Sequence, residues 1–231
     1  MKPTIVADFA YVSPKGKGKT SGYRHLRSKL KYVQYRDDRN THIKQRELAD
    51  RWQDHGLGNN YRAILNNCAA LSSKHVLAWT WIISPAPDLM ALVPEELRRD
   101  LVIDLTERVV ESYYTARGLD IPEYSFVLHD RLTNEQDDGE PGLQQLHTHV
   151  FLPGTTPTLE GRQAVYNNKD KGHEKLFHEV AAQHFEAALD LIVGPDWRLL
   201  RQEPELVPTT PDVDDLDAWF PREREQERDH D

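Results

Sequence analysis

Short apolar runs along the chain mark its expected strands. They are rich in Val, Ile, Leu, Phe and Trp, are bounded by Gly, Pro or charged residues, and occupy 4–12, 74–84, 123–130 and 143–154. Such runs are typical of strands in a sheet with at least one buried face. The acidic turn at 131–142 separates the last two runs, which predicts an antiparallel hairpin. The segment 161–168 favours one more short strand.

Other segments repeat their apolar residues at helical spacing. In 23–39, Leu26, Leu30 and Val33 follow the i, i+4, i+7 spacing of a helix with one buried stripe. The pattern also predicts helices at 44–56, 60–73, 93–118 and 173–194. Strands and helices do not alternate strictly along the chain. The sequence therefore predicts an α+β domain, with a mostly antiparallel central sheet and helices packed on it.

The end of the chain has a different composition. We expect the folded domain to span residues 1–200. Residues 202–231 contain 11 acidic and three basic residues, together with four prolines. Such a segment cannot bury enough apolar surface to fold, so the composition predicts an acidic, largely disordered tail.

Composition limits the kind of protein. One cysteine, Cys68, in 231 residues excludes a disulfide scaffold and a cysteine-rich zinc module, and it fits a reducing compartment. No stretch approaches the roughly 18 apolar residues of a membrane span, and residues 1–12 lack a secretory apolar segment. We therefore expect a cytoplasmic protein without membrane partners.

The charge is distributed unevenly. Residues 1–76 carry 15 Lys and Arg against six Asp and Glu, a balance of +9, whereas the whole chain has a net charge of -9. The remaining residues therefore carry -18. A basic N-terminal third can follow a phosphate backbone even in an acidic chain. It can equally be a solvated surface, and charge alone does not separate the two.

The first predicted helix carries tyrosines among cations. At about 100° per residue, Tyr32 and Tyr35 lie roughly 120° and 180° from the apolar stripe. The same outer face holds Arg24, Arg27, Ser28 and Lys31. These tyrosines are either ordinary residues of the surface or of a second interface, or participants in phosphate chemistry.

Histidines gather on the predicted hairpin. In a strand, residues i and i+2 point to the same side about 6.5–7 Å apart, so His147 and His149 face together. His129 ends the preceding strand and can approach the same point. Three neutral imidazoles can hold one divalent ion and leave positions open for a substrate oxygen. Asp130 is a candidate for orienting a ligand or the turn.

The H-x-H spacing is weak by itself, because 11 histidines in 231 residues produce about half an occurrence per chain by chance. Its setting adds weight, since the pair lies inside an apolar strand with a third histidine on the expected neighbouring strand. The competing interpretation is a set of ordinary structural or surface histidines.

Two stretches together resemble a known family. The segments "FVLHDR" and "GLQQLHTHVFLPGT" resemble the histidine motif of DNA relaxases, the mobilisation nucleases of conjugative and mobilisable plasmids. These belong to the HUH-type single-strand endonucleases. The segment "RSKLKYVQYR" is similar to the tyrosine segment of the same family, and the order of the segments agrees. The resemblance covers roughly residues 1–190.

The resemblance implies a role for each matching residue. His129, His147 and His149 would hold a divalent ion such as Mn²⁺, Mg²⁺ or Zn²⁺, and imidazole ligands suit Mn²⁺ or Zn²⁺ better than Mg²⁺. Tyr32 would be the nucleophile, with Tyr35 as its rival. The phosphate contacts would come from Arg24, Arg27, Lys29, Lys31 and Arg36.

The implied activity is sequence-specific nicking and strand transfer of single-stranded DNA, in plasmid mobilisation or rolling-circle replication. Tyrosine attack would leave a 5′-phosphotyrosine and a free 3′-OH. Because the chain lacks a helicase or primase domain, accessory mobilisation or replication proteins are expected as partners. Two alternatives remain: a three-histidine metallohydrolase that uses metal-bound water, and a non-catalytic DNA-binding relative.

Overall fold

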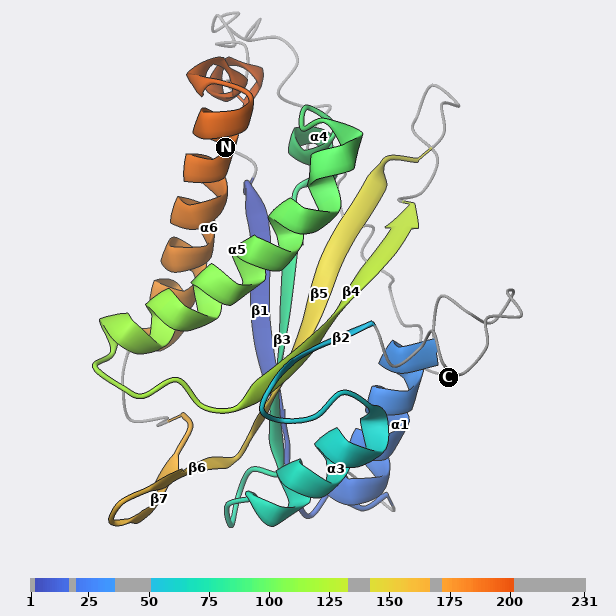
Figure 1. The fold of residues 1–231 in the computed structure, drawn as a ribbon, viewed down its shortest axis with the longest axis vertical. Coiled ribbons are helices and arrows are strands. Elements are labelled where there is room, and N and C mark those ends of the chain that lie inside the picture. Colours follow the sequence, from blue (N-terminus) through green and yellow to red (C-terminus); the bar gives the residue numbers. More distant parts are fainter. Residues whose placement is uncertain (1–2, 17–19, 36–50, 133–141, 167–171, 202–231) are drawn as a thin grey trace, which may run out of the picture.

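The fold is α+β, as the sequence predicts. A computed structural model describes residues 3–16, 20–35, 51–132, 142–166 and 172–201. Figure 1 shows a central sheet with α5 and α6 gathered on one side and α1 and α3 on the other. The helices therefore cover the sheet in two separate groups.

The central sheet is antiparallel throughout. Its strands are β1 (Ile5–Val12), β2 (Trp52–His55), β3 (Ala78–Pro85), β4 (Tyr124–Leu132) and β5 (Gln144–Pro153), in the spatial order β1-β3-β5-β4-β2. The expected hairpin is confirmed, since β4 pairs with β5 from Ser125 opposite Phe151 to Leu132 opposite Gln144. A separate two-stranded sheet consists of β6 (Thr155–Thr158) and β7 (Gly161–Ala164).

The described helices include four that lie close to the ranges predicted from apolar periodicity and two short ones, at Pro87–Met90 and Pro195–Arg201, that the sequence did not predict. They are α1 (Gly22–Tyr35), α3 (Tyr61–Ala70), α4 (Pro87–Met90), α5 (Glu95–Ala116) and α6 (His173–Ile192), followed by a 3-10 helix at Pro195–Arg201. The side chain of Asn60 caps α3 by accepting from the backbone N–H groups of Arg62 and Ala63 at 3.1 and 3.0 Å. This cap satisfies two donors that the first turn of a helix leaves free.

The larger core lies between the sheet and the helices α5 and α6. Trp81, Phe126 and Val150 project from one face of the sheet, and Val109 and Phe177 meet them from α5 and α6. All five side chains are buried. Burial of this much apolar surface is the main stabilising contribution to the fold.

A second core lies on the opposite face, under α1 and α3. Val127 and Phe151 project from β4 and β5 towards Leu26, Leu30 and Ile64 on the helices. Because successive side chains of a strand alternate between faces, odd-numbered residues of β4 and β5 all point to this second core. This alternation also decides where the histidines lie.

A buried amide ties α1 to its neighbours. The Oε1 atom of Gln34 accepts hydrogen bonds from the indole Nε1 of Trp52 at 3.2 Å and from the backbone N–H of Tyr61 at 2.8 Å. Buried polar atoms need such partners. The C-terminal part of α1 is thereby fixed against both β2 and the start of α3.

The helix predicted at 44–56 is wrong over its described part, because residues 52–55 form β2. Trp52 is buried opposite Val127 of β4, and Asp54 Oδ1 accepts from the N–H groups of Gly56 and Gly58 at 2.9 and 2.8 Å. Pairing with a distant strand overrides the local helical periodicity here. Residues 44–50, the hairpin turn at 133–141 and the acidic tail at 202–231 lie outside the described residues.

Candidate metal centre

The three predicted histidines converge on the sheet face that α1 and α3 cover in part. His129 of β4 lies directly opposite His147 of β5, and His149 lies opposite Val127. All three share the face of Val127 and Phe151, two residues of the second core. The hairpin pairing and the two-residue alternation of a strand together bring the rings to one place.

Their geometry fits a shared ion. One ring nitrogen from each of His129, His147 and His149 lies within 4.8 Å of the other two, and the ring centroids are 4.8 to 5.4 Å apart. Nitrogens bound at about 2.0–2.1 Å to a tetrahedral ion lie roughly 3.3 Å apart, so binding of one ion would draw the three nitrogens closer together. His129 and His147 are only 1% and 5% exposed, which screens the site from water.

Backbone carbonyls select which nitrogen two of the rings can offer. The Nε2 atom of His129 is 2.6 Å from the carbonyl oxygen of Val33, and the Nδ1 atom of His147 is 3.2 Å from that of Gln145. A carbonyl oxygen only accepts, so each of these nitrogens carries the proton. The nitrogens left for an ion are Nδ1 of His129 and Nε2 of His147, an arrangement common among metal-binding histidines.

The Val33 carbonyl makes α1 part of the candidate metal centre. Val33 belongs to α1. The hydrogen bond between its carbonyl oxygen and His129 Nε2 therefore joins this helix to the hairpin that carries the histidines.

A contact on the opposite face of β5 also holds the strand that carries H-x-H. Thr148 points to the opposite face, where its hydroxyl lies 2.8 Å from that of Thr106 on α5. The Thr106 hydroxyl also bonds to the carbonyl of Val102 at 2.8 Å. Both threonines are completely buried. Their contact therefore fixes the position of Thr148, the residue between the two histidines, relative to α5.

Asp130 lies on the other face of β4 from the histidine rings. Its carboxylate accepts a hydrogen bond from Gln144 across the base of the hairpin at 2.8 Å. The sequence predicted that Asp130 orients either a ligand or the turn. Its contact with Gln144 lies near the turn and away from the histidine rings. The outer contacts of His129 and His147 come from carbonyl oxygens instead.

The two candidate tyrosines differ in environment. Tyr32 is 42% exposed and directly precedes Val33. Tyr35 is half-buried and its ring packs on Tyr61 at a centroid distance of 6.2 Å. Tyr35 therefore packs partly against the second core, one of the positions that the sequence left open for the two tyrosines.

The predicted phosphate-binding residues are distributed differently as well. Arg24 and Arg27 are exposed on α1, and Lys31 is half-exposed. Lys29 reaches the sheet, where its Nζ atom donates to Thr80 Oγ1 at 2.8 Å. Burial lowers the pKa of the Lys29 amine, and the nearby Asp8 carboxylate opposes that shift. Arg36 lies outside the described residues.

A third tyrosine, which the sequence did not single out, is surrounded by cations. The Tyr61 hydroxyl accepts from Arg62 Nε at 3.0 Å, and Lys31 Nζ lies 5.2 Å from the centroid of its ring. The hydrogen bond from Arg62 lowers the pKa of Tyr61, and the charges of Arg62, Lys31 and Arg27 act in the same direction. The dipeptide "YR" does not predict this cationic environment, because Lys31 and Arg27 come from another helix.

A pocket opens at the edge strand β1 on the basic side of the molecule. It has a volume of about 790 Å³ and includes the basic residues Lys15, His25 and Lys29 and the aromatic residues Tyr11 and Trp79. Tyr11 is 56% exposed and packs against Trp79 at a centroid distance of 5.5 Å. Trp79 itself is buried, so Tyr11 is the exposed ring of the pair. An exposed aromatic ring beside basic side chains is a combination found in proteins that bind single-stranded nucleic acid.

Comparison with known proteins adds no family assignment. No protein-family model matches the chain, and no curated protein matches its sequence. The relaxase resemblance therefore depends on the residues discussed above. Among the described residues, no helix is both long and apolar enough to cross a bilayer.

Proposed function

We propose that this chain is a sequence-specific, single-stranded DNA nickase and strand transferase, similar to the relaxases of plasmid mobilisation. The observation that carries the proposal is the convergence of His129, His147 and His149 beside the end of α1. That helix also bears Tyr32 and the exposed cations Arg24 and Arg27. A metal site, a phenol and a phosphate-binding surface are the three parts that such a reaction needs.

The donor set fits a divalent ion. Imidazole nitrogens suit Mn²⁺ or Zn²⁺ better than Mg²⁺. When bound to His129 Nδ1, His147 Nε2 and His149, such an ion would offset the negative charge that builds up on the non-bridging oxygens of a phosphodiester. The carbonyls of Val33 and Gln145 keep the rings of His129 and His147 in the required tautomers.

Tyr32 is the nucleophile in this proposal. Its phenolic oxygen forms a bond to the phosphorus, the bond from phosphorus to the 3′ oxygen breaks, and that oxygen leaves as a 3′-OH after taking up a proton. The DNA then stays attached through a 5′-phosphotyrosine, which a second 3′-OH can attack to rejoin a strand. The exposure of Tyr32 and its position beside Val33 favour it over Tyr35, which packs on Tyr61.

The strand would follow the basic side of the molecule. Arg24, Arg27 and Lys31 supply phosphate contacts from α1, and Tyr11 offers a ring on which a base can stack at the β1 pocket. Strands β1 and β5 are both neighbours of β3, so they lie about 10 Å apart at the usual strand spacing. Tyr11 lies opposite Trp79, which lies opposite Leu152 of β5, so its ring is on the sheet face away from the histidines. A DNA strand that contacts both would pass around the edge strand β1.

Covalent trapping tests this proposal directly. The protein is incubated with a mixed-sequence library of single-stranded oligonucleotides and Mn²⁺, resolved under denaturing conditions, and the attached DNA is sequenced. We expect a metal-dependent covalent adduct that Tyr32→Phe abolishes and that Tyr35→Phe retains.

Two results would contradict the nickase proposal. Cleavage that continues unchanged in Tyr32→Phe and Tyr35→Phe, without an adduct, would indicate that water is the nucleophile. Salt-sensitive binding without cleavage, under every metal tested, would indicate a non-catalytic DNA-binding protein. Circular dichroism of each variant shows whether the fold is retained.

A further inference from the structure

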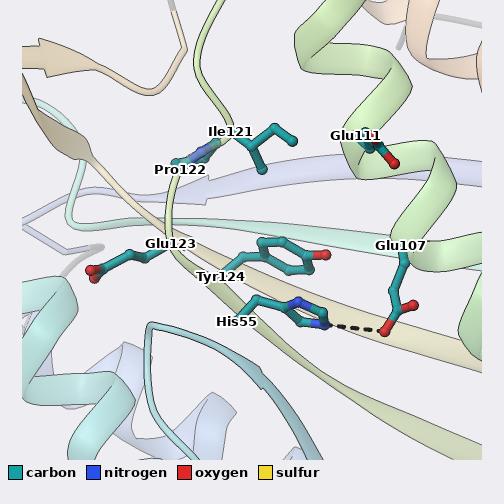
Figure 2. Close-up of a pocket in the computed structure, with 7 residues that line it drawn as sticks. All are labelled: His55, Glu107, Glu111, Ile121, Pro122, Glu123 and Tyr124. Carbon is teal, nitrogen blue, oxygen red and sulfur yellow. Dashed lines mark ion pairs between the residues drawn. The ribbon is translucent and has the colours of Figure 1, made fainter.

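A second pocket lies on the sheet face opposite the histidines, where β2 and β4 meet α5. It has a volume of about 430 Å³, and carboxylates form much of its wall. Figure 2 shows Glu107 and Glu111 extending from α5, with the hydroxyl of Tyr124 pointing towards them from β4. Ile121 and Pro122 form an apolar side of the same pocket.

The pocket holds more negative charge than its own residues balance. His55 Nε2 lies 3.2 Å from Glu107 Oε1. Within the described ranges, Glu111 has neither a hydrogen bond nor an ion pair. Glu107 and Glu111 are four residues apart on one helix, a spacing at which like charges repel each other. A positive group between them would remove that repulsion.

A tyrosine side chain that is more than nine-tenths buried, with its hydroxyl at the pocket, provides an independent sign of a ligand. Tyr124 is only 6% exposed, and its ring stacks on His55 with a centroid distance of 4.3 Å. Its hydroxyl points into the pocket and makes no hydrogen bond to any residue that the structure describes. Burial raises the pKa of Tyr124, and Glu107 and Glu111 raise it further. The hydroxyl therefore stays protonated, and its oxygen is available to accept a hydrogen bond.

The spacing of these groups argues against a small metal ion. In the described part of the chain, only the histidine triad brings three candidate ligand atoms within 4.8 Å of one another. The donors of this pocket are more widely spread. A larger cation with several N–H groups can reach separate carboxylates, and its alkyl chain can lie on an apolar wall.

We propose that this pocket binds an alkylammonium or guanidinium group. Its nitrogen atoms would lie between Glu107 and Glu111, donate to the Tyr124 oxygen, and leave the carbon chain against Ile121 and Pro122. Ile121 is 46% exposed, so it is accessible for this contact. The group belongs either to a free polyamine or to a Lys or Arg side chain of a partner protein. The site lies on the opposite face from the proposed nuclease centre and does not depend on it.

Calorimetric titration of the full chain tests the site with three probes: spermidine, agmatine and N-acetyl-arginine amide. We expect saturable binding that Glu107→Gln combined with Glu111→Gln weakens at least tenfold. Tyr124→Phe should weaken it less, because it removes one acceptor and keeps the ring. Tighter binding of spermidine would identify a free polyamine as the source, and tighter binding of the arginine amide would identify a protein side chain.

The control is Glu95→Gln combined with Glu96→Gln, which makes the same change of charge on exposed residues of α5 outside the pocket. We expect the control to bind all probes as the unmodified protein does. The proposal is overturned if none of the three probes binds saturably at millimolar concentration. It is equally overturned if both double variants weaken binding to the same degree, since that result means diffuse attraction to an acidic protein. Circular dichroism confirms that each variant is folded.

Discussion

The hydroxyls of Thr148 and Thr106 lie 2.8 Å apart across the boundary between β5 and α5. Thr148 is the residue between the two histidines of the H-x-H motif. Its partner therefore anchors the H-x-H segment from the face that the histidines do not occupy.

Replacing Thr106 with Val should weaken both the fold and the metal site. The change leaves the Thr148 hydroxyl buried without its partner, a loss of about 1–3 kcal/mol in the free energy of unfolding. Because β5 then loses its anchor, we expect metal affinity to fall by about tenfold, the lower end of the usual cost of losing an outer-shell contact. Urea unfolding and metal titration measure the two effects. Thr115→Val, at an exposed position of α5, should change neither.

Removing a histidine should have a larger effect on the metal. We expect His149→Ala to lower Mn²⁺ or Zn²⁺ affinity by more than the roughly 10–100-fold that loss of an outer-shell partner causes, because a donor itself is lost. Competition with a metal-sensitive dye gives the affinities. His178→Ala, at an exposed position of α6, is the control and should bind metal normally. Equal affinities for the two variants would show that the triad does not bind the ion.

Arg27 should contribute to DNA binding through one phosphate. We expect Arg27→Gln to weaken binding of single-stranded DNA whatever its sequence, and to reduce the slope of log affinity against log salt concentration by about 0.7. Fluorescence anisotropy with labelled oligonucleotides at several salt concentrations measures both. Arg99→Gln, an exposed position of α5, should leave the slope as it is. An unchanged slope in Arg27→Gln would mean that the DNA does not contact Arg27.

The buried thiol of Cys68 should make stability depend on pH in the alkaline range. Burial raises the pKa of Cys68 from 9.0 to about 12, so unfolding lets the thiol release its proton between these values. The stability that the buried neutral thiol provides is therefore complete below pH 9.0 and is lost as the pH rises towards 12.

We expect about 1.4 kcal/mol of this loss at pH 10, relative to pH 8. Urea unfolding gives the free energy of unfolding of each protein at the two pH values. The difference between the two pH values in the unmodified chain, compared with the same difference in Cys68→Ala, isolates the contribution of the thiol. The same pH dependence in Cys68→Ala would mean that other groups cause it.

Local pattern predicts most of the elements because each element has its own periodicity. The Leu26, Leu30, Val33 stripe predicts α1, and the hairpin segments predict β4 and β5. The prediction fails at β2, where four residues become a strand only because Trp52 is buried against Val127. The family resemblance implied that Lys29 contacts phosphate, and only the packed structure shows its amine bonded to Thr80.

By itself, the sequence determined the α+β class, the histidine hairpin and the basic character of the N-terminal third, because strand alternation, helical spacing and charge are local properties. Tertiary structure alone decided that α1 ends beside His129, that Thr106 supports Thr148, and that cations from two helices surround Tyr61. Each of these is a contact between segments distant in the chain. Such contacts depend on how elements pack against each other, and no periodicity within a single segment encodes that packing.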